Sequence, residues 1–258
     1  MPANSRLRDL LERYRAGEVS LDAAAQEIEG LRLEAVGELA QIDLGRPVRC
    51  GLPEAVLAEG KSAAQLAAIV VSHARAAGRC IATRVRPEQA EAVRCAAGEA
   101  GLVLEERPGG GVLIVSDGRP RPRTGGIVAV VTAGTSDIPV AEEARTVAEE
   151  MGCTVLCAYD VGAAGIHRLF PAIRSLLGAH VFVVAAGREG TLPAVVAGLV
   201  DRPVIGVPVS TGYGHLGGGE AALGSMLQSC SVIAVVNIDA GFVAGAFAAR
   251  VANQAVGA

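Results

Sequence analysis

The stretch from Ile127 to Ala144, which reads IVAVVTAGTSDIPVAEEA, decides the fold. It opens with an apolar, β-branched run, which is typical of a parallel strand buried on both faces. Small and hydroxyl residues follow, and a pattern compatible with a helix begins directly after them. At the carboxyl end of such a strand Gly134 lets a ligand approach the backbone, and Thr135, Ser136 and Asp137 offer hydroxyls and a carboxylate. The segment predicts a ligand-binding turn; the alternative is an ordinary turn in which Asp137 caps the next helix.

The same order of strand and helix repeats beyond residue 126. We expect strands near 127–133, 153–158, 180–185, 203–207 and 232–236. Helices are expected near 138–151, 165–177, 190–200, 218–229 and 240–255. Five such units with short connections predict an α/β domain whose parallel sheet is covered on both faces. Sheets of this kind bind ligands beyond the carboxyl ends of their strands.

The first part of the chain predicts a smaller α/β domain with a helical N-terminus. Two helices are expected between residues 5 and 30, the second capped by Ser20. Further helices are expected at 62–76 and 87–100, and strands at 81–85, 102–105 and 112–115. We therefore place an N-terminal domain at 1–118, a linker at 119–126 and a second domain at 127–258.

The linker is rich in proline, glycine and arginine, so regular structure is not expected there. Its arginines are Arg119, Arg121 and Arg123. We expect them to be solvated; the alternative is a strap that contacts phosphate groups.

Composition excludes several classes of function. The formal net charge of −4 leaves no basic footprint for a nucleic-acid backbone. No uncharged apolar run has the length and flanks of a membrane helix, and the N-terminus does not resemble a signal sequence. The hydrophobic share of 51% supplies a large core, and the aromatic share of only 3% means that small side chains fill it. We expect a soluble, cytoplasmic protein without nucleic-acid or membrane partners.

The cysteines give little support for a metal site or a disulfide framework. The chain has six cysteines and no Cys-x-x-Cys pair, so we expect reduced thiols. Cys153 and Cys157 lie on an apolar run and are interpreted as two small buried residues rather than a metal pair. The four histidines lack ligand spacing relative to the cysteines, so no metal ligands are predicted.

Chemically useful residues collect where the five expected strands end. Any one of these segments is a weak signal, because turns prefer the same residues. Five on one rim of one domain indicate a binding site. The residues that we expect to bind the substrate are Gly134, Thr135, Ser136, Asp137, Asp160, His167, Gly187, Gly190, Asn237 and Asp239. For Asp160 a capping role, and for His167 a structural one, are the alternatives.

Three further side chains are candidates for catalysis. Glu189 lies on a glycine-flanked turn, as a general base or as a carboxylate at a helix start. His215 lies in the glycine-rich loop 212–219, which could close over a ligand; the alternative is an exposed loop histidine. Cys230 ends a helical run before an apolar strand. This pattern alone favours a small buried residue, and a nucleophilic role would need a nearby cation or base.

Taken together, several of these segments resemble one family. The motifs are AGTSDIPVAEEA (133–144), YDVGxxGIHR (159–168), GxEGxLPxVVAG (187–198), PVIGVPxSxGYG (203–214), MLxSC (226–230) and NIDxGF (237–242). In this combination they resemble the LarB family of carboxylase–hydrolases, which begin synthesis of the nickel-pincer nucleotide cofactor of lactate racemase. The N-terminal half is similar in its pattern and in DLGRP (43–47). The Thr-Ser-Asp and PVIGVP segments also resemble aminoimidazole ribonucleotide carboxylase (PurE-like), which implies a flavodoxin-like, three-layer fold for 127–258.

The resemblance implies a substrate and a reaction. The substrate would be nicotinic acid adenine dinucleotide (NaAD), which is carboxylated by CO2 at C5 of its pyridinium ring and hydrolysed at its phosphoanhydride. The products would be pyridinium-3,5-biscarboxylic acid mononucleotide and AMP. The family's catalytic cysteine falls on Cys230 and its essential glutamate on Glu189, and His215 is expected to orient or activate the thiol.

The resemblance also sets expectations for cofactors and assembly. No tightly bound cofactor is expected, although Mg2+ could accompany the substrate phosphates. A homo-octamer assembled through the C-terminal domain is expected, because the purine enzyme forms octamers. Two alternatives are an aminoimidazole ribonucleotide carboxylase or mutase, which would not need Cys230, and a non-catalytic nucleotide-binding module, which would not need Glu189.

Overall fold

The computed structural model describes residues 3–109 and 111–257 of the chain. Backbone contacts divide the protein into two units. The first unit holds the chain up to Ala82, together with Glu88–Leu104 and Ile114–Gly118. The second holds Thr83–Pro87, Glu105–Leu113 and the chain from Arg119 onward.

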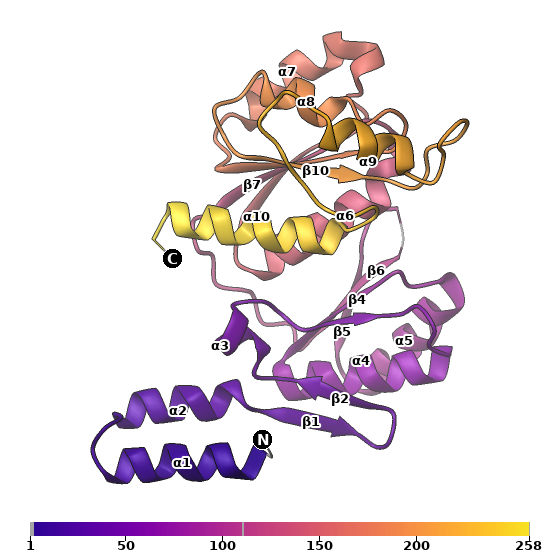
Figure 1. Ribbon diagram of the computed structural model, residues 1–258. Helices are drawn as coiled ribbons and strands as arrows, with labels where there is room; N and C mark the ends of the chain where they lie inside the picture. The colour runs from indigo at the N-terminus through magenta and orange to yellow at the C-terminus, as the bar shows by residue number, and fades with distance from the viewer. Residues whose placement is uncertain (1–2, 110, 258) are drawn as a thin grey trace. The chain divides into compact units, whose positions relative to one another are not determined.

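In the second unit strands and helices alternate, as the sequence predicts (Figure 1). The strands are β7 (Ile127–Thr132), β8 (Thr154–Ala158), β9 (Val181–Ala186), β10 (Val204–Pro208) and β11 (Ala234–Val235). The helices are α6 (Ile138–Glu150), α7 (Leu169–Leu176), α8 (Leu192–Ala197), α9 (Glu220–Leu227) and α10 (Gly241–Ala255). The strands form one parallel sheet in the order β11-β10-β9-β7-β8. This order changes direction beside the first strand of the domain, as in flavodoxin-like sheets, and confirms the predicted fold.

Helices cover both faces of this sheet (Figure 1), and alternate residues of each strand face opposite layers. Val128 and Val130 pack in a core with α6 and α10. Ala129 and Val131 pack in a second core with α7, α8 and α9. A strand buried on both faces needs a continuous apolar run, and this run is the pattern that predicted β7.

Helices α6 and α10 approach each other closely because small residues line their contact. A Cβ added at Gly241 would lie 2.0 Å from the carbonyl oxygen of Val140, and one at Gly245 would lie 2.2 Å from that of Ala144. Both contacts involve backbone atoms, so neither helix can relieve them by turning a side chain. The two glycines therefore fix the spacing of this layer.

Two predicted elements of the second unit differ from the structure. The helix expected at 165–177 begins as a 3-10 segment, Ala163–Arg168, in which Gly165 has non-helical backbone angles. The strand expected at 232–236 shortens to Ala234–Val235. Beyond it the chain still bonds to β10, because the Val236 N–H donates to the carbonyl of Gly206 and the Asp239 N–H to that of Pro208.

The first unit is also α/β, as predicted. Its helices are α1 (Ala3–Arg15), α2 (Leu21–Gly30), α3 (Arg46–Cys50), α4 (Ala63–Ala77) and α5 (Pro87–Glu99). The remaining strands are β1 (Leu33–Val36), β2 (Ala40–Asp43), β3 (Ala55–Leu57), β4 (Arg79–Thr83), β5 (Val103–Glu106) and β6 (Val112–Ser116). β3 to β6 form a sheet in the order β3-β4-β6-β5, and β1 pairs with β2 antiparallel.

Local signals explain which of these elements the sequence predicted. The Ser20 hydroxyl accepts a hydrogen bond from the Ala23 N–H at 3.2 Å, so the expected cap of α2 is confirmed. Helix α4 begins after a capping box formed by Ser62 and Gln65. The β1–β2 hairpin was not predicted, since β1 is largely exposed and lacks the alternation of a half-buried strand.

Among the described residues, no helix is long and apolar enough to cross a bilayer.

Replacing Gly245 with alanine should lower the free energy of unfolding by roughly 1–3 kcal/mol, because the new Cβ would overlap the α6 backbone. Gly224 in α9 is the matched control, since a Cβ there meets no atom within 4 Å. Its replacement with alanine should be neutral or stabilise the protein by up to about 1 kcal/mol. Urea unfolding of both variants measures the difference, and equal effects would contradict the packing argument.

Acid should destabilise the protein through His73 of α4. This side chain is 3% exposed, and burial lowers its pKa to about 4. Below the unfolded-state pKa of about 6.5, His73 is protonated in the unfolded chain but stays neutral in the folded protein. The free energy of unfolding therefore falls as the pH drops from 6.5 toward 4. The loss should reach roughly 2 kcal/mol near pH 5. Urea unfolding near pH 7.5 and near pH 5 measures this loss, and the free energy of unfolding of His73→Leu should fall by roughly 2 kcal/mol less than that of the parent protein. An identical loss in both proteins would refute the assignment.

Candidate functional site

The loops that follow β7 and β10 meet at the carboxylate of Asp137, which is 3% exposed. One carboxylate oxygen accepts a hydrogen bond from the backbone N–H of Gly134 at 2.9 Å. The other accepts one from the hydroxyl of Thr211 at 3.4 Å. Burial raises the pKa of Asp137, and these two hydrogen bonds oppose the rise. Asp137 stands at the N-cap position of α6, but its carboxylate makes no capping hydrogen bond to that helix, so the alternative of a side-chain cap is not what the structure shows.

The loop that follows β9 joins the same cluster because two glycines let the backbones touch. A Cβ at Gly187 would lie 3.0 Å from the Thr211 hydroxyl and 3.1 Å from a carboxylate oxygen of Asp137. A Cβ at Gly212 would lie 2.0 Å from the carbonyl oxygen of Gly187, closer than any side chain can approach. Gly187 therefore lies beside Asp137, and three strand ends converge on one carboxylate.

Thr135 and Ser136 occupy a 3-10 turn that ends at Asp137. Both are exposed, so their hydroxyls are open to a ligand at the edge of the cluster. Together with Gly134 they form a polar turn directly beyond β7. The four residues of this predicted binding segment therefore lie together.

Asp160 and His167 lie in the loop that follows β8. Asp160 has a left-handed backbone with φ of 57°. Its N–H donates to the Thr132 hydroxyl at 3.0 Å, and its carboxylate pairs with Arg168 at 2.7 Å. His167 is exposed on the 3-10 segment beside Arg168. Asp160 is thus held by hydrogen bonds in a strained backbone conformation directly after a strand, and such residues cluster at binding sites.

Asp239 holds the corresponding position beyond β11, again with a left-handed backbone at φ of 55°. One of its carboxylate oxygens accepts a hydrogen bond from the Ser210 N–H at 2.8 Å, which joins this loop to that of β10. Asn237 is exposed and uses its side-chain oxygen to accept from the neighbouring Ile238 N–H at 2.9 Å.

Arg84 is a residue of this surface that the sequence did not indicate. Its guanidinium donates to the carbonyl of Asp239 at 2.9 Å and lies 3.7 Å from the carboxylate of Glu143. Its own backbone is left-handed, with φ of 54°. Arg84 precedes Asp239 by 155 residues, and no local pattern could have paired them.

Glu189 and His215 are both exposed, on the loops that follow β9 and β10. Gly190 follows Glu189 with φ of +67°, and a Cβ there would lie 2.5 Å from the carbonyl oxygen of Ala222. Gly190 thus fixes the turn that presents Glu189. No hydrogen bond or ion pair joins Glu189 to His215 in the described part of the chain.

Arg188 and Tyr213 stack at the tips of these two loops. The Arg188 guanidinium lies 4.2 Å from the centroid of the Tyr213 ring. Tyr213 is 72% exposed, so its other surface is open to solvent. The sequence drew attention to the glycine-rich loop but not to this pair. The sequence did contain a signal for this pair, since Arg188 directly follows Gly187 and Tyr213 directly follows Gly212, the two glycines whose backbones touch.

Cys230 is exposed, so the interpretation as a buried small residue is wrong. The reason is that α9 ends at Leu227, and Cys230 lies in the turn before β11 rather than inside a helix. The next residue, Ser231, donates from its hydroxyl to the carbonyl of Ala194 in α8 at 3.1 Å. Cys230 therefore precedes its strand, whereas the other candidates follow theirs. Between residues 111 and 257 no hydrogen bond or ion pair links it to Glu189 or His215.

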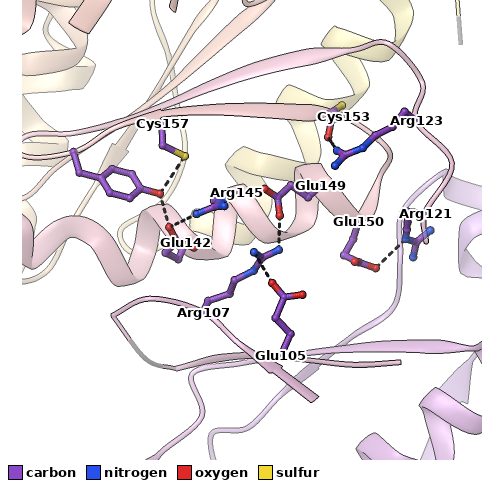
Figure 2. A network of polar contacts seen from close by, with 11 residues as sticks. Glu105, Arg107, Arg121, Arg123, Glu142, Arg145, Glu149, Glu150, Cys153 and Cys157 are labelled. Carbon is purple, nitrogen blue, oxygen red and sulfur yellow. Dashed lines mark hydrogen bonds and ion pairs between the residues drawn. The ribbon is translucent and has the colours of Figure 1, made fainter. Parts of the chain in front are cut away.

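A polar network under α6 supports the β8 loop (Figure 2). The Tyr159 hydroxyl donates to the fully buried carboxylate of Glu142 and lies 3.3 Å from the sulfur of Cys157. Arg145 lies 3.3 Å from the same carboxylate and 3.0 Å from that of Glu149. Burial and these neighbours raise the pKa of Tyr159, so the hydroxyl remains a donor. The network fixes Tyr159 directly before Asp160.

Two linker arginines are exposed, as expected, and also contact residues of the second unit (Figure 2). Arg121 pairs with Glu150 at 2.9 Å, and Arg123 donates to the carbonyl of Cys153 at 2.6 Å. Carboxylate and carbonyl acceptors within the chain compete with solvent because they are already held in place. These contacts anchor the linker beside α6 and β8.

The two cysteines of the 153–157 run differ in burial. Cys153 is buried, as expected, whereas Cys157 is exposed because β8 is an edge strand. In residues 3–109 and 111–257, no three His, Cys, Asp or Glu side chains gather as metal ligands would.

Comparison with known proteins identifies both parts of the chain. Residues 127–258 match the family of AIR carboxylase, and residues 33–105 match the LarB/PurE-like N-terminal domain. An uncharacterised protein of Methanocaldococcus jannaschii is 41% identical over 253 residues, which is 96% of this chain and 97% of that protein.

Other relatives match about half of the chain. The N5-carboxyaminoimidazole ribonucleotide mutase of Methanocaldococcus jannaschii is 32% identical over 45% of this chain and 71% of its own length. A probable mutase of the same type from Methanothermobacter thermautotrophicus is 30% identical over 48% of this chain and 37% of its own length. These mutases match less than half of this chain, whereas the two family models together cover most of it. The chain belongs to the LarB family, in which a LarB/PurE-like N-terminal domain is joined to an AIR carboxylase domain.

Proposed function

We propose that the protein carboxylates the pyridinium ring of NaAD at C5 with CO2 and hydrolyses its phosphoanhydride. The products are pyridinium-3,5-biscarboxylic acid mononucleotide and AMP. The observation that carries the proposal is the convergence of three strand-end loops on Asp137 in a chain of the LarB family. These loops present the hydroxyls of the 135–137 turn, the carboxylate of Glu189 and the imidazole of His215 at one edge of the sheet.

The chemistry requires a nucleophile because the ring and CO2 are both electrophiles. The thiolate of Cys230 adds to C6 of the pyridinium, and the ring electrons move to give an enamine that is nucleophilic at C5. C5 then forms a bond to CO2. Loss of the C5 proton and departure of the thiolate restore the aromatic ring. The exposure of Cys230 supports this role, since a thiol must reach a ring atom directly.

Glu189 is proposed as the base that takes the C5 proton, and His215 as the group that orients the thiol. The turn at Gly190 supports the first assignment, because it holds Glu189 outward from a rigid strand end. Thr135, Ser136 and Asp137 are proposed to hold the nucleotide, with Asp160 and Asp239 on either side.

The hydrolysis step has no single assigned water activator. Mg2+ would shield the phosphates and favour attack at phosphorus. The described side chains offer no protein ligand set for it, so such an ion would be held by the substrate phosphates.

Cys230 precedes its strand, β11, whereas Glu189 follows β9, so the two residues are placed at different ends of their strands. A second copy of the protein would bring such residues together. We propose a homo-octamer formed through residues 127–258. Exposed apolar side chains beside Cys230 support the presence of a second copy there: Leu227 is 66% exposed and Val232 is 94% exposed. Large apolar side chains left this open are typical of an interface.

An aminoimidazole ribonucleotide mutase activity is the second candidate, favoured by the mutases that match about half of the chain. It needs the same fold and nucleotide turn but no thiol. The loss of Cys230 therefore separates the two reactions.

Purified protein incubated with NaAD, Mg2+ and 13C-bicarbonate should give a mononucleotide with one heavy carboxylate, together with AMP, detected by mass spectrometry. Cys230→Ser should abolish the labelled product, because an alcohol is far less nucleophilic than a thiolate at neutral pH. Cys95→Ser is the control, since Cys95 is also an exposed thiol but lies in α5. No label from a wild-type protein that binds NaAD would overturn the carboxylase proposal, and an aminoimidazole ribonucleotide turnover that survives Cys230→Ser would favour the mutase.

Glu189→Gln should reduce kcat for carboxylation by about 10²- to 10⁴-fold with a smaller change in KM, because an amide cannot accept the C5 proton. Substrate deuterated at C5 should show a larger isotope effect on kcat in this variant than in the wild type. Asp201→Asn, which removes an exposed carboxylate elsewhere in the same unit, is the control. A Glu189→Gln enzyme with normal kcat would exclude Glu189 as the base.

A further inference from the structure

The stacked pair at the tips of the β9 and β10 loops is unexplained by the fold. Arg188 lies 4.2 Å from the centroid of the Tyr213 ring, and Tyr213 is 72% exposed. Burial is how an aromatic ring stabilises a fold, and a ring that is 72% exposed contributes little in this way. An aromatic ring at the tip of a loop instead offers its face to whatever the loop contacts.

The backbone holds this pair beside the binding turn. Gly187 and Gly212 abut so closely that neither has room for a side chain, and Arg188 and Tyr213 are the next residues in each loop. Gly187 also lies against the buried carboxylate of Asp137. The pair therefore lies where the loops converge: Arg188 directly precedes Glu189 in the β9 loop, and Tyr213 is two residues before His215 in the β10 loop.

The contact itself indicates what the ring prefers. The face of a tyrosine ring attracts cations, and planar cations gain dispersion contact as well. A guanidinium is a planar cation of one positive charge. A pyridinium ring has the same charge and the same flat shape, so the surface that holds Arg188 also fits a pyridinium.

We propose that Tyr213 is the platform on which the pyridinium ring of the substrate stacks, with Arg188 occupying that ring face until the ligand arrives. This inference rests on the proposed function and names the residue that recognises the charged ring. The displaced guanidinium then lies among the anionic groups that the substrate carries, its carboxylate and phosphate. Only a side chain has to move, because Arg188 is exposed and its guanidinium leaves the ring without disturbing the backbone contact of Gly187 and Gly212.

The test compares two ligands that differ in the charge of the ring. Nicotinic acid mononucleotide carries a pyridinium, and its 1,4-dihydro form carries a neutral ring. Neither has a phosphoanhydride, and calorimetry without bicarbonate measures binding in the absence of turnover. Wild type should bind the pyridinium form roughly 3- to 30-fold more tightly, as expected for a cation on an aromatic face. Tyr213→Phe should keep this preference, and Tyr213→Leu should reduce it to about 1-fold.

Phe170→Leu, which removes a half-exposed aromatic ring from α7, is the control and should leave the preference unchanged. Fluorescence gives a second readout, because the chain has three tyrosines and no tryptophan. Pyridinium binding should quench the emission of the wild type, and Tyr213→Phe should bind as well but lose most of the quenching.

A preference that survives Tyr213→Leu, or that Tyr213→Phe abolishes, would overturn the platform assignment. Quenching that persists in Tyr213→Phe would do the same. Failure of the carboxylation assay is a separate result, since a charge preference that depends on Tyr213 would still establish a site for planar cations.

Discussion

The buried carboxylate of Asp137 is the constraint on which the candidate site depends. Removing a carboxylate from water is costly, and here the Gly134 N–H and the Thr211 hydroxyl offset part of that cost. Those two partners come from loops that follow different strands. The β7 and β10 loops are therefore fixed by their hydrogen bonds to this carboxylate. The β9 loop is fixed because the backbone of Gly187 packs against the same carboxylate. The positions of Arg188, Glu189 and Tyr213 follow from this arrangement.

Small side chains make the arrangement rigid enough to be useful. Backbone-to-backbone contact at Gly187 and Gly212, and again between α6 and α10 at Gly245, leaves no flexible side chain to absorb a displacement. Close backbone packing of this kind leaves little room for large rings, and aromatic residues make up only 3% of the chain. An exposed tyrosine in such a protein is therefore more informative than it would be in one rich in aromatic residues.

The sequence was sufficient for the fold of the second unit, because buried parallel strands and amphipathic helices leave strong local patterns. It was also sufficient for the Gly134–Asp137 turn. It failed wherever a contact joins distant segments. Asp137 looked like a helix cap because the Thr211 hydroxyl was invisible in a local pattern, and Arg84 could not be connected to Asp239 across 155 residues. The hairpin of β1 and β2 was missed for another reason, namely its exposure, which removes the alternation that marks a strand.

Cys230 illustrates a limit that a local pattern cannot overcome. Its neighbours predicted burial, yet it lies exposed before β11 and is flanked by the exposed Leu227 and Val232. An apolar pattern reports only that a segment avoids water, and it does not distinguish a core from an interface between copies. Both environments select the same side chains. In the proposed octamer the pattern around Cys230 is that of an interface, which reconciles its apolar neighbours with the access that a nucleophile needs.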